Sequence, residues 1–595
     1  MEDYPDGTVK NNSGLIIPEG TILTDTLLRI FNYNKLSQLY SESAEKDAVS
    51  LITALFNKMN LFIDIPQEDL ANIPEEGPFI TVSNHPYRGV DSMILMKLIS
   101  KKRKDFKILA SHTLKTIDPF DKVIIPVNTS ESAGKANSSI PGIREALAYL
   151  SAGHGIGIFP TAEDSGQWES PRIILDPEWN PAALKLIKLP QVPVVPVYFH
   201  GTRTRISQVI SLLNPLQQNT ALPEELVNKK KRIVRVRIGA PVTVKEQAEF
   251  SNVLKLGRYL RARVYSLGST IENKKQSKFL GSGKKVVVEP VIDPVDPALL
   301  REEFEYVRTS HELFTIKNYT AICAPVESIP NIFREIGRLR EVTFREVGEG
   351  TNKSIDIDEY DFYYYHLFIW DTDENRLVGA YRLGKGREII DTYGIKGFYI
   401  NSLFGIKKKL IPVLRESIEL GRSFITRDYQ RKPIPLFLLW KGIMIFLLRH
   451  AEYRYLIGPV SISNDLSRFS KTLIVDFIRT YFFNDALAKY IKPRKDFVLK
   501  PDKVVDRNVF IDLSEKDINK IEKVIIDIEP GYKIPVLLKK YLEINGRIIG
   551  FNIDPAFNNC LDGLLILDLN ATPEEFIRAL SKEMNDPRIL ERFGK

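Results

Sequence analysis

Short apolar runs and helical repeats alternate along residues 78 to 200 of the chain. Runs of this length and apolar content are typical of buried strands, and they are PFITVSN, FKILAS, KVIIPVN, HGIGIFP and VPVVPVYF. Segments with apolar residues at helical spacing predict helices, and they are SMILMKLISKK, GIREALAYLSAG and AALKLIKLP. Strands that alternate with helices predict an α/β domain whose sheet is largely buried and mostly parallel.

The pattern changes on either side of this domain. Residues 24 to 62 place apolar side chains at helical spacing, which predicts one or two amphipathic helices within a leading segment, 1–60. Residues 271–299 are polar and then rich in glycine and proline, as linkers are. We therefore place the first α/β domain at 61–270.

A second domain with a mixed α/β pattern is predicted over residues 300–595. HLFIWD and RLVGAYRLG flank the turn-forming TDEN and predict an antiparallel hairpin. IELGRSFI and YRYLIGPVSIS predict further strands, with a helix at 435 to 450 between them. The tail, from KIPVLLKKYLEINGRIIGFNI to DGLLILDL, continues these patterns and completes the same domain.

Charge and cysteine content indicate which partners the protein could bind and in which compartment it lies. The formal charge of +8 and the pI of about 9.0 are modest for 595 residues, but basic residues gather at 101–104, 229–232 and 407–409. Such runs attract nucleic acid, anionic lipid or an acidic carrier protein, or they are solvated faces. Cys323 and Cys560 lie too far apart in sequence to define a disulfide framework or a zinc site, so we expect a reducing, cytoplasmic location and no metal.

No segment has the features of a signal peptide or the ~18 uninterrupted apolar residues of a membrane span. The N-terminal MEDYPDGTVKNNSG lacks a basic region and an apolar core. The most apolar segment, residues 433 to 450, is divided by Lys441 and Arg449 and suits a buried domain helix or an interfacial helix. We expect a protein that is soluble or peripheral to a membrane.

The stretch VSNHPYRGVDSMIL, residues 82 to 95, follows a predicted strand and opens a predicted helix, where α/β domains tend to place reactive groups. His85 and Asp91 are six residues apart, which is about 600° of rotation on a helix, so the two side chains would point apart if both were helical. They can meet if His85 lies in a loop made by Pro86 and Gly89 and Asp91 opens the helix. Asp91 could also serve as the N-cap of that helix.

The block SNHPYRGVD resembles the Asn-His-x4-Asp signature of the glycerolphosphate and lysophospholipid acyltransferases, with one extra residue between His and Asp. The resemblance implies a glycerolphosphate acyltransferase-like α/β domain in which His85 is the general base for an acceptor hydroxyl. It implies that Asp91 holds the imidazole in the correct tautomer and that Asn84 lies at the substrate. It implies no covalent enzyme intermediate.

The other blocks of that family are only partly kept. KVIIPVN matches the second block in its apolar middle, but Asn128 stands where the family has an Arg that grips a phosphate. FPTAEDS, residues 159 to 165, keeps the frame of Phe-Pro-Glu-Gly-Thr-Arg-Ser, with Pro160 retained, the carboxylate moved to Glu163, and Asp164 in place of the Arg. VPVVPVYFHG matches the fourth block. Because two cationic positions are lost, we expect an acceptor that has a hydroxyl but no phosphomonoester.

Five further side chains bear on the same pocket without deciding its chemistry. Arg144, Arg172 or Arg203 could supply a substitute positive charge. His154 and His200 fall near the third and fourth blocks, and they could line the pocket or be structural.

Residues 331 to 466 resemble a second family, the GNAT-type N-acyltransferases that use acyl-carrier protein (ACP), begin ornithine-lipid synthesis and are similar to autoinducer synthases. The matching blocks are REIGRLREVTFREVGEG, DIDEYDFYYYHLFIWD, RLVGAYRLG and IELGRSFITRDYQ. The resemblance implies substrate-binding roles for Arg340, Arg345, Asp358, Asp361, His366 and Arg382. RDYQRKPIP stands where GNAT enzymes have their coenzyme A loop, so we expect acyl-ACP rather than acyl-CoA as the donor, and no bound cofactor.

Glu419 and Arg422 lie on the predicted strand IELGRSFI and are the predicted catalytic residues of this domain. N-acylation needs a neutral amine beside a thioester carbonyl and a group that takes up a proton, which Glu419 could do directly or through water. Arg422 could bind a substrate carboxylate or the acyl carbonyl. On a regular strand the side chains of Glu419 and Arg422 face opposite sides of the sheet, so a shared site requires a bulge at Gly421. In the alternative, Glu419 and Arg422 form a surface ion pair and Gly421 allows close packing.

Together the two domains resemble the bacterial bifunctional aminolipid synthases, over nearly all of the chain from about residue 60. The resemblance implies that the C-terminal domain joins a 3-hydroxyacyl group from ACP to the α-amine of ornithine or glycine. The N-terminal domain then acylates the 3-hydroxyl of that product. The implied partners are ACP, the amino acid, the lyso-aminolipid and an anionic membrane surface, with no nucleic acid, and the implied location is the inner face of the cytoplasmic membrane.

Two other interpretations stay open at this point. One is a lysophospholipid acyltransferase whose GNAT-like domain binds ACP or regulates, without chemistry of its own. The other is a non-catalytic membrane-surface adaptor that uses the basic runs, which leaves both sets of motifs unexplained. The sequence also leaves the amino acid open, since ornithine would need an acidic partner for its side-chain ammonium and glycine would not.

Overall fold

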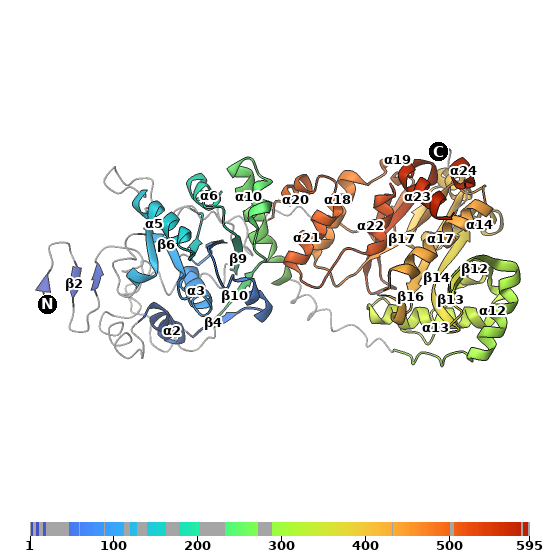
Figure 1. Ribbon diagram of the computed structural model, residues 1–595, viewed down its shortest axis with the longest axis horizontal. Helices are drawn as coiled ribbons and strands as arrows, with labels where there is room; N and C mark the ends of the chain where they lie inside the picture. Colours follow the sequence, from blue (N-terminus) through green and yellow to red (C-terminus); the bar gives the residue numbers. More distant parts are fainter. Residues whose placement is uncertain are drawn as a thin grey trace. The chain divides into compact units, whose positions relative to one another are not determined.

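A computed structural model of the chain shows two compact units, and each is described by itself (Figure 1). The first unit holds residues 1–279, 501–513 and 524–530, and the second holds 280–500, 514–523 and 531–595. The structure describes residues 2–3, 8–10, 16–18, 47–58, 60–87, 90–111, 120–127, 140–161, 178–201, 232–271, 288–430, 432–499, 505–584 and 587–592.

The first unit is built on a seven-stranded sheet. Its strands are β4 (Leu61–Asp64), β5 (Phe79–Ser83), β6 (Lys107–Ser111), β7 (Ile124–Val127), β8 (Gly155–Ile158), β9 (Val194–His200) and β10 (Arg232–Ile238). The order is β4-β10-β9-β5-β8-β6-β7, and every neighbouring pair is parallel except β10 with β9. The predicted mostly parallel sheet is therefore confirmed. Strands β4 and β10 were not predicted, and Leu61 and Phe62 of β4 end a segment that was predicted to be helical.

The helices of this unit include each of the three predicted between its strands. They are α2 (Ala48–Lys58), α3 (Val90–Ile99), α5 (Ile140–Ser151), α6 (Pro181–Lys188), α9 (Val244–Ala248) and α10 (Val253–Ser266). Helix α2 is the described part of the predicted leading helices, since residues 24 to 46 lie outside the described residues. Within the predicted leading segment, β1 (Glu2–Asp3), β2 (Thr8–Lys10) and β3 (Ile16–Pro18) form a small antiparallel sheet.

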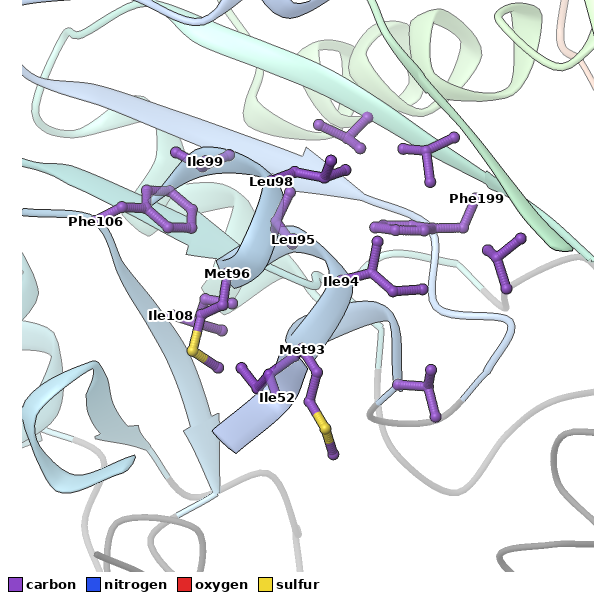
Figure 2. Packing of buried hydrophobic residues seen from close by; sticks show 14 of the residues in the cluster. Ile52, Met93, Ile94, Leu95, Met96, Leu98, Ile99, Phe106, Ile108 and Phe199 are labelled. Atoms are coloured by element: carbon purple, nitrogen blue, oxygen red, sulfur yellow. The ribbon is translucent and has the colours of Figure 1, made fainter. Parts of the chain in front are cut away.

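Helix α3 is apolar on nearly every side because it packs against both α2 and the sheet. Figure 2 shows Ile94 and Leu95 of α3 in this core, with Ile52 of α2 and with Ile108 and Phe199 of the sheet. Every one of these five side chains is fully buried or nearly so. The packing fixes the position of α3, and with it the first turn, which carries Asp91.

The second unit is built on an eight-stranded sheet. Its strands are β11 (Glu312–Ile316), β12 (Tyr319–Pro325), β13 (Tyr365–Asp371), β14 (Arg376–Lys385), β16 (Ser417–Ile425), β17 (Tyr455–Ile462), β19 (Arg547–Asp554) and β20 (Cys560–Asp568). The order is β11-β12-β13-β14-β16-β17-β20-β19, and only the β16–β17 pair is parallel. The predicted β13–β14 hairpin is confirmed, and β15 (Phe404–Ile406) and β18 (Ile491–Pro493) form a separate antiparallel pair.

Helices cover both faces of the second sheet (Figure 1). They are α12 (Pro297–His311), α13 (Pro330–Glu346), α14 (Gly386–Tyr393), α15 (Ile400–Leu403), α16 (Ile411–Arg415), α17 (Pro433–Arg449), α18 (Arg468–Tyr481), α19 (Asp485–Ala488), α22 (Val536–Glu543), α23 (Glu574–Met584) and α24 (Arg588–Arg592). Alternate residues of β13 serve the two faces, because Phe368 and Trp370 join the core under α12 and α13, whereas Leu367 meets Gly442 of α17.

Helix α17 coincides with the most apolar segment of the sequence. It packs on β11, β12, β13 and β14 as a domain helix. The two charges that divide the segment both meet β11, since Lys441 Nζ lies 5.3 Å from the ring centroid of Phe314 and Arg449 donates to the carbonyl of Glu312 at 3.0 Å. In the described part of the chain, none of the helices combines the length and the apolar character that crossing a bilayer requires.

The predicted domain from 300 to 595 is interrupted by two segments that belong to the first unit. These carry α20 (Asn508–Ser514) and the second half of α21 (Ile518–Ile528). They are held through α10, where Arg263 binds Asp527 at 2.6 Å and the rings of Tyr259 and Phe510 meet at 5.9 Å. No change of composition marks these segments in the sequence, because the contacts that place them are long-range.

Candidate active sites

The first candidate site lies after β5, where the chain turns into α3. His85 lies in the loop and Asp91 in the first turn of α3, as predicted. His85 Nδ1 lies 2.7 Å from Asp91 Oδ2, and the backbone N–H of Tyr87 donates to both oxygens of Asp91 at 3.0 and 3.1 Å. The buried carboxylate can therefore orient the imidazole and stabilise its positive charge, which makes Nε2 the nitrogen that would take a proton.

The His85 side chain is 20% exposed and is covered on one side by an aromatic ring. Phe159 follows β8, and its ring centroid lies 4.5 Å from that of His85. Because β5, β8 and β9 are parallel, their carboxyl ends meet at one edge of the sheet, where His85, Pro160 and His200 all lie. A substrate that reaches this edge can contact the imidazole.

The other residues predicted for this site have structural contacts or are not described. Asn84 is a correction: it is buried, its amide donates to the carbonyl of Phe199 at 3.0 Å and accepts from the N–H of Phe199 at 2.8 Å, so both polar ends bind β9. Pro160 is buried, and its carbonyl accepts a bond from the N-cap residue of α6 at 2.8 Å. Asn128 and Glu163 lie outside the described residues.

The two other histidines considered for this pocket lie at different edges of the sheet. His154 precedes β8, at the edge opposite His85, and its Nδ1 lies 3.0 Å from Asp105 Oδ2, which makes it structural. His200 ends β9 at the same edge as His85, and its carbonyl accepts a bond from the hydroxyl of Tyr87 at 2.8 Å. Of the three arginines considered as replacement charges, Arg144 is exposed on α5, and Arg172 and Arg203 lie outside the described residues.

The second candidate site begins at a bulge in β16. Gly421 pairs with Arg382 and Phe424 pairs with Ala380, so two residues of β16 oppose one of β14. The predicted bulge is thus present, but the left-handed residue is Arg422, with φ of 50°, and not Gly421. A left-handed conformation costs a residue with a side chain about 1–2 kcal/mol, so the contacts of Arg422 must offset that cost.

Glu419 is fully buried and already accepts three hydrogen bonds. Its Oε1 accepts from the N–H of Ile400 at 2.8 Å, and its Oε2 accepts from the N–H of Tyr399 at 3.1 Å and from the hydroxyl of Tyr364. Burial raises the pKa of Glu419 to about 7. A direct role as proton acceptor, predicted from the sequence, would require these bonds to break first, and the observed contacts instead hold the start of α15.

A buried network of arginine and aspartate side chains lies beside the bulge. Arg340 binds Asp361 at 2.8 and 3.0 Å, Asp358 binds Arg382 at 2.5 Å and Arg422 at 3.1 Å, and Arg382 also reaches Asp361 at 3.1 Å. Arg340, Asp361 and Arg382 are at most 1% exposed. These three were predicted to bind substrate, but they bind one another, and the network ends at Arg422.

Two further residues predicted to bind substrate are structural. His366 is buried and its Nε2 donates to the carbonyl of Asp361 at 2.9 Å; burial lowers its pKa to about 4, so the ring is neutral at pH 7. Arg345 binds Glu341 at 2.6 Å and donates to the carbonyl of Glu289 at 2.8 Å, which holds the end of α13 to the segment before α12. The sequence placed both near the site but could not show these partners.

The sheet opens between β16 and β17. Their parallel pairing covers only three positions, from Ser417 to Glu419. At Gly458 of β17 any side chain would overlap the carbonyl oxygen of Leu420 of β16, so the two strands approach closely there. The next residue, Pro459, has no N–H that could continue the hydrogen-bond ladder. In β16 the bulge at Arg422 bends the strand, and β16 and β17 have no pairing beyond Glu419.

A cavity of about 320 Å³ opens at this separation. It is lined by Phe344, Glu349, Tyr381, Tyr399, Leu420 to Ser423, Leu456 to Ser461, Pro535 to Leu537, Tyr541, Asp554, Phe557, Asp562 and Leu565. Arg422 is the one predicted site residue in this lining, and Glu419 is absent from it. The volume suits part of a thioester substrate.

Three carboxylates line the cavity together with Arg422 and Tyr399, and none of the three was predicted. Burial is the main cause that raises the pKa of Glu349, of Asp554 and of Asp562, the last to about 7. The sequence does carry a signal for one of them, because Asp562 directly precedes the apolar run GLLIL of a predicted strand and an isolated buried charge is costly. Among the described residues no group of His, Cys, Asp and Glu side chains is arranged to hold a metal.

In comparisons with known proteins, each of the two units matches an acyltransferase family. A family described as acyltransferase matches residues 31–273, and one described as acetyltransferase (GNAT) domain matches residues 339–440. A glycine N(alpha)-acyltransferase of Bacteroides thetaiotaomicron is 30% identical over 296 residues, which cover 47% of this chain and 86% of the relative. Its counterpart in Phocaeicola vulgatus is 28% identical over 302 residues, covering 48% of this chain and 91% of the relative.

A third relative has a different name. The lyso-glycine lipid O-acyltransferase of Bacteroides thetaiotaomicron is 23% identical over 249 residues, which cover 40% of this chain and 88% of the relative. Each of the three relatives covers less than half of this chain, whereas the chain covers most of each of them. The two kinds of relative are separate proteins, and the chain has similarity to both.

Proposed function

Because the chain belongs to the acyltransferase family that includes the glycine Nα-acyltransferases and carries a second acyltransferase domain, we propose that it is a bifunctional enzyme of aminolipid synthesis. The second unit joins a 3-hydroxyacyl group to the α-amine of an amino acid, which is glycine or ornithine. The first unit adds a second acyl chain to the 3-hydroxyl of that product. The names of the relatives favour glycine over ornithine.

The observation that carries the proposal is that one chain contains two candidate sites of different geometry, each suited to a different acyl acceptor. The His85–Asp91 pair is suited to a hydroxyl acceptor, and the cavity between β16 and β17 is suited to a thioester and an amine. The product of the second site has a hydroxyl and a carboxylate but no phosphate. This agrees with Asn128 and Asp164, which stand where phosphate-binding relatives of the first domain have cations.

The O-acyl transfer uses His85 as a general base. Nε2 takes the proton of the acceptor hydroxyl as its oxygen attacks the thioester carbonyl, and Asp91 stabilises the imidazolium through Nδ1. The C–S bond then breaks, and the imidazolium returns the proton to the leaving thiolate. The new bond is an ester, and no acyl group is carried on the protein.

The proposed partners follow from the donor chemistry and from the surface. The segment after β16 contains the exposed Arg427 and Lys432 in place of a coenzyme A loop, which supports acyl-ACP as the donor, with acyl-CoA as the alternative. An acidic carrier protein suits such basic side chains. We place the enzyme at the inner face of the cytoplasmic membrane, where an anionic surface holds its lyso-lipid substrate and product.

The test is expression in a bacterial host that lacks aminolipids, followed by mass spectrometry of the lipids. The wild-type protein should produce a diacylated, amide-linked aminolipid, and the mass of the headgroup identifies the amino acid. His85→Ala should stop at the monoacylated amino acid. If the wild-type protein yields no amide-linked lipid but rescues a defect in lysophosphatidate acylation, the proposal is wrong and the enzyme is a lysophospholipid acyltransferase.

A further inference from the structure

The cavity between β16 and β17 contains a carboxylate in a better position for proton transfer than Glu419. Asp562 lies on β20, directly across the ladder from Ser461 of β17, and both line the cavity. The side chain is 2% exposed. Its Oδ1 accepts from the Ser461 hydroxyl at 2.7 Å and lies 3.6 Å from the Cys560 sulfur, and no described residue donates to Oδ2.

Glu419 and Asp562 thus differ in what their oxygens do. Both oxygens of Glu419 are bound by donors of the protein, and the residue does not line the cavity. Asp562 has one oxygen fixed by Ser461, which sets its orientation, and the other oxygen without a donor from the described residues. A general base needs a lone pair that the protein does not already occupy, and of the two only Asp562 both lines the cavity and has an oxygen without a described donor.

The charges around Asp562 keep its proton affinity high. The titratable and charged groups that surround the cavity near it are Glu349, Tyr399, Arg422, Asp554 and Cys560. Burial and the charges of Asp554 and Glu349 raise the pKa of Asp562 to about 7, and the bond from Ser461 opposes the rise. A base with a pKa near the working pH is the most effective, since it is deprotonated in part and still binds a proton firmly.

We propose that Asp562 is the proton acceptor of the amide-forming reaction, a step that rests on the proposed function of the second unit. The amine reaches the carboxylates of the cavity as an ammonium and gives a proton to solvent on binding. The neutral nitrogen attacks the thioester carbonyl carbon, the C–N bond forms, and Asp562 takes the second proton of that nitrogen. The C–S bond breaks, and Asp562 returns this proton to the thiolate, which leaves as a thiol. Glu419 is then a positioning residue that holds Tyr399 and α15.

The test is steady-state N-acylation by the purified full-length protein, with a 3-hydroxyacyl thioester of ACP and with glycine or ornithine, from pH 5.5 to 9. For the wild type we expect kcat to rise with pH through about 7, because the bound amine has already lost its proton and Asp562 is the group that titrates in the complex. Asp562→Asn, which keeps the shape and the Ser461 contact, should lower kcat on the order of 100-fold or more and abolish this rise. Its thermal unfolding temperature should not fall below that of the wild type.

Two further variants distinguish a general base at Asp562 from a carboxylate with a structural role. Glu349 lies in the same cavity, and in Glu349→Gln the rise should move to lower pH, because removal of a neighbouring negative charge lowers the pKa of Asp562. Glu419→Gln should keep the rise near pH 7. The proposal is overturned if Asp562→Asn retains both kcat and the rise, or if the rise is lost in Glu419→Gln instead. If the wild type forms no amide with either amino acid, the proposed function itself fails.

Discussion

Asp91→Asn tests whether the first site is an oriented general base. In the wild type, Asp91 Oδ2 lies 2.7 Å from His85 Nδ1 and both of its oxygens accept from the N–H of Tyr87. The side-chain amide that this substitution introduces keeps one oxygen for Tyr87, so the loop should stay in place. The amide carries no negative charge to stabilise the imidazolium of His85. Its NH₂ group can also donate to Nδ1, which favours the tautomer with the proton on Nε2. In that tautomer Nε2 cannot accept the proton of the acceptor hydroxyl.

The effect on catalysis should exceed the effect on folding. Loss of tautomer control and charge stabilisation should lower kcat for O-acylation by on the order of 10²–10⁴. At ~1.4 kcal/mol per factor of ten, this is about 3–5 kcal/mol of lost transition-state stabilisation. The folded state loses only the charge in one hydrogen-bonded pair, which costs about 1–3 kcal/mol.

The first unit offers a matched control at the other edge of its sheet. Asp105 lies 3.0 Å from His154 and binds Arg103 at 2.6 Å, so Asp105→Asn removes a comparable charge from a comparable pair. The assay is acyl transfer from a thioester to a supplied monoacylated amino acid, with thermal unfolding in parallel. Asp105→Asn should lose stability and keep kcat, whereas Asp91→Asn should lose a similar amount of stability and most of its kcat. An Asp91→Asn enzyme within tenfold of the wild-type kcat would show that Asp91 does not orient a general base.

Three further changes test the second unit. Burial raises the pKa of Glu419 from 4.5 to about 7, so its carboxyl keeps a proton in the folded state that it releases in the unfolded state between these values. Glu419 should therefore contribute a loss of stability on the order of 3 kcal/mol as pH rises across that window. In urea unfolding measured from pH 4 to 8, Glu419→Gln should remove this contribution and leave that of Asp562. Arg340→Ala leaves Asp361 without its bidentate partner and should cost about 3–5 kcal/mol in the same measurement, and an unchanged stability with a raised KM would instead support a substrate role. Gly458→Ala forces a methyl group onto the carbonyl of Leu420, so it should cost about 1–3 kcal/mol and reduce N-acylation, while O-acylation in the same sample stays constant.

The sequence predicts the elements that apolar patterning controls. The strands around β5 and the β13–β14 hairpin were predicted because a run of apolar residues has few other ways to be buried. The position of Asp91 could also be predicted, since six residues from His85 are too many for one helix face and the loop is the alternative. The placement of the second half of α21 with the first unit could not, because it depends on contacts such as that of Arg263 with Asp527, 264 residues apart.

The site shows a different limit. A resemblance gives the place of a residue but not the partner of its side chain, so Asn84 and Arg340 were predicted to bind substrate although β9 and Asp361 occupy their polar groups. A bulge at Gly421 was the condition for Glu419 and Arg422 to share a site, but the residue of the bulge with a left-handed φ is Arg422, although glycine adopts such a φ more easily. Asp562 is far from Glu419 in sequence, and only the fold brings it to the cavity.

The left-handed Arg422 explains why the Arg–Asp network is buried beside the cavity rather than exposed to substrate. The bulge turns this side chain to one position, where it lies 3.1 Å from Asp358 and between the rings of Tyr399 and Phe557, at 4.9 and 4.5 Å. Asp358 is held in turn by Arg382, so the guanidinium is fixed before any substrate binds. Rigid charges cost no reorganisation during the reaction. On the proposed function, we expect the network to act on catalysis through Arg422, so its loss should affect stability and activity together.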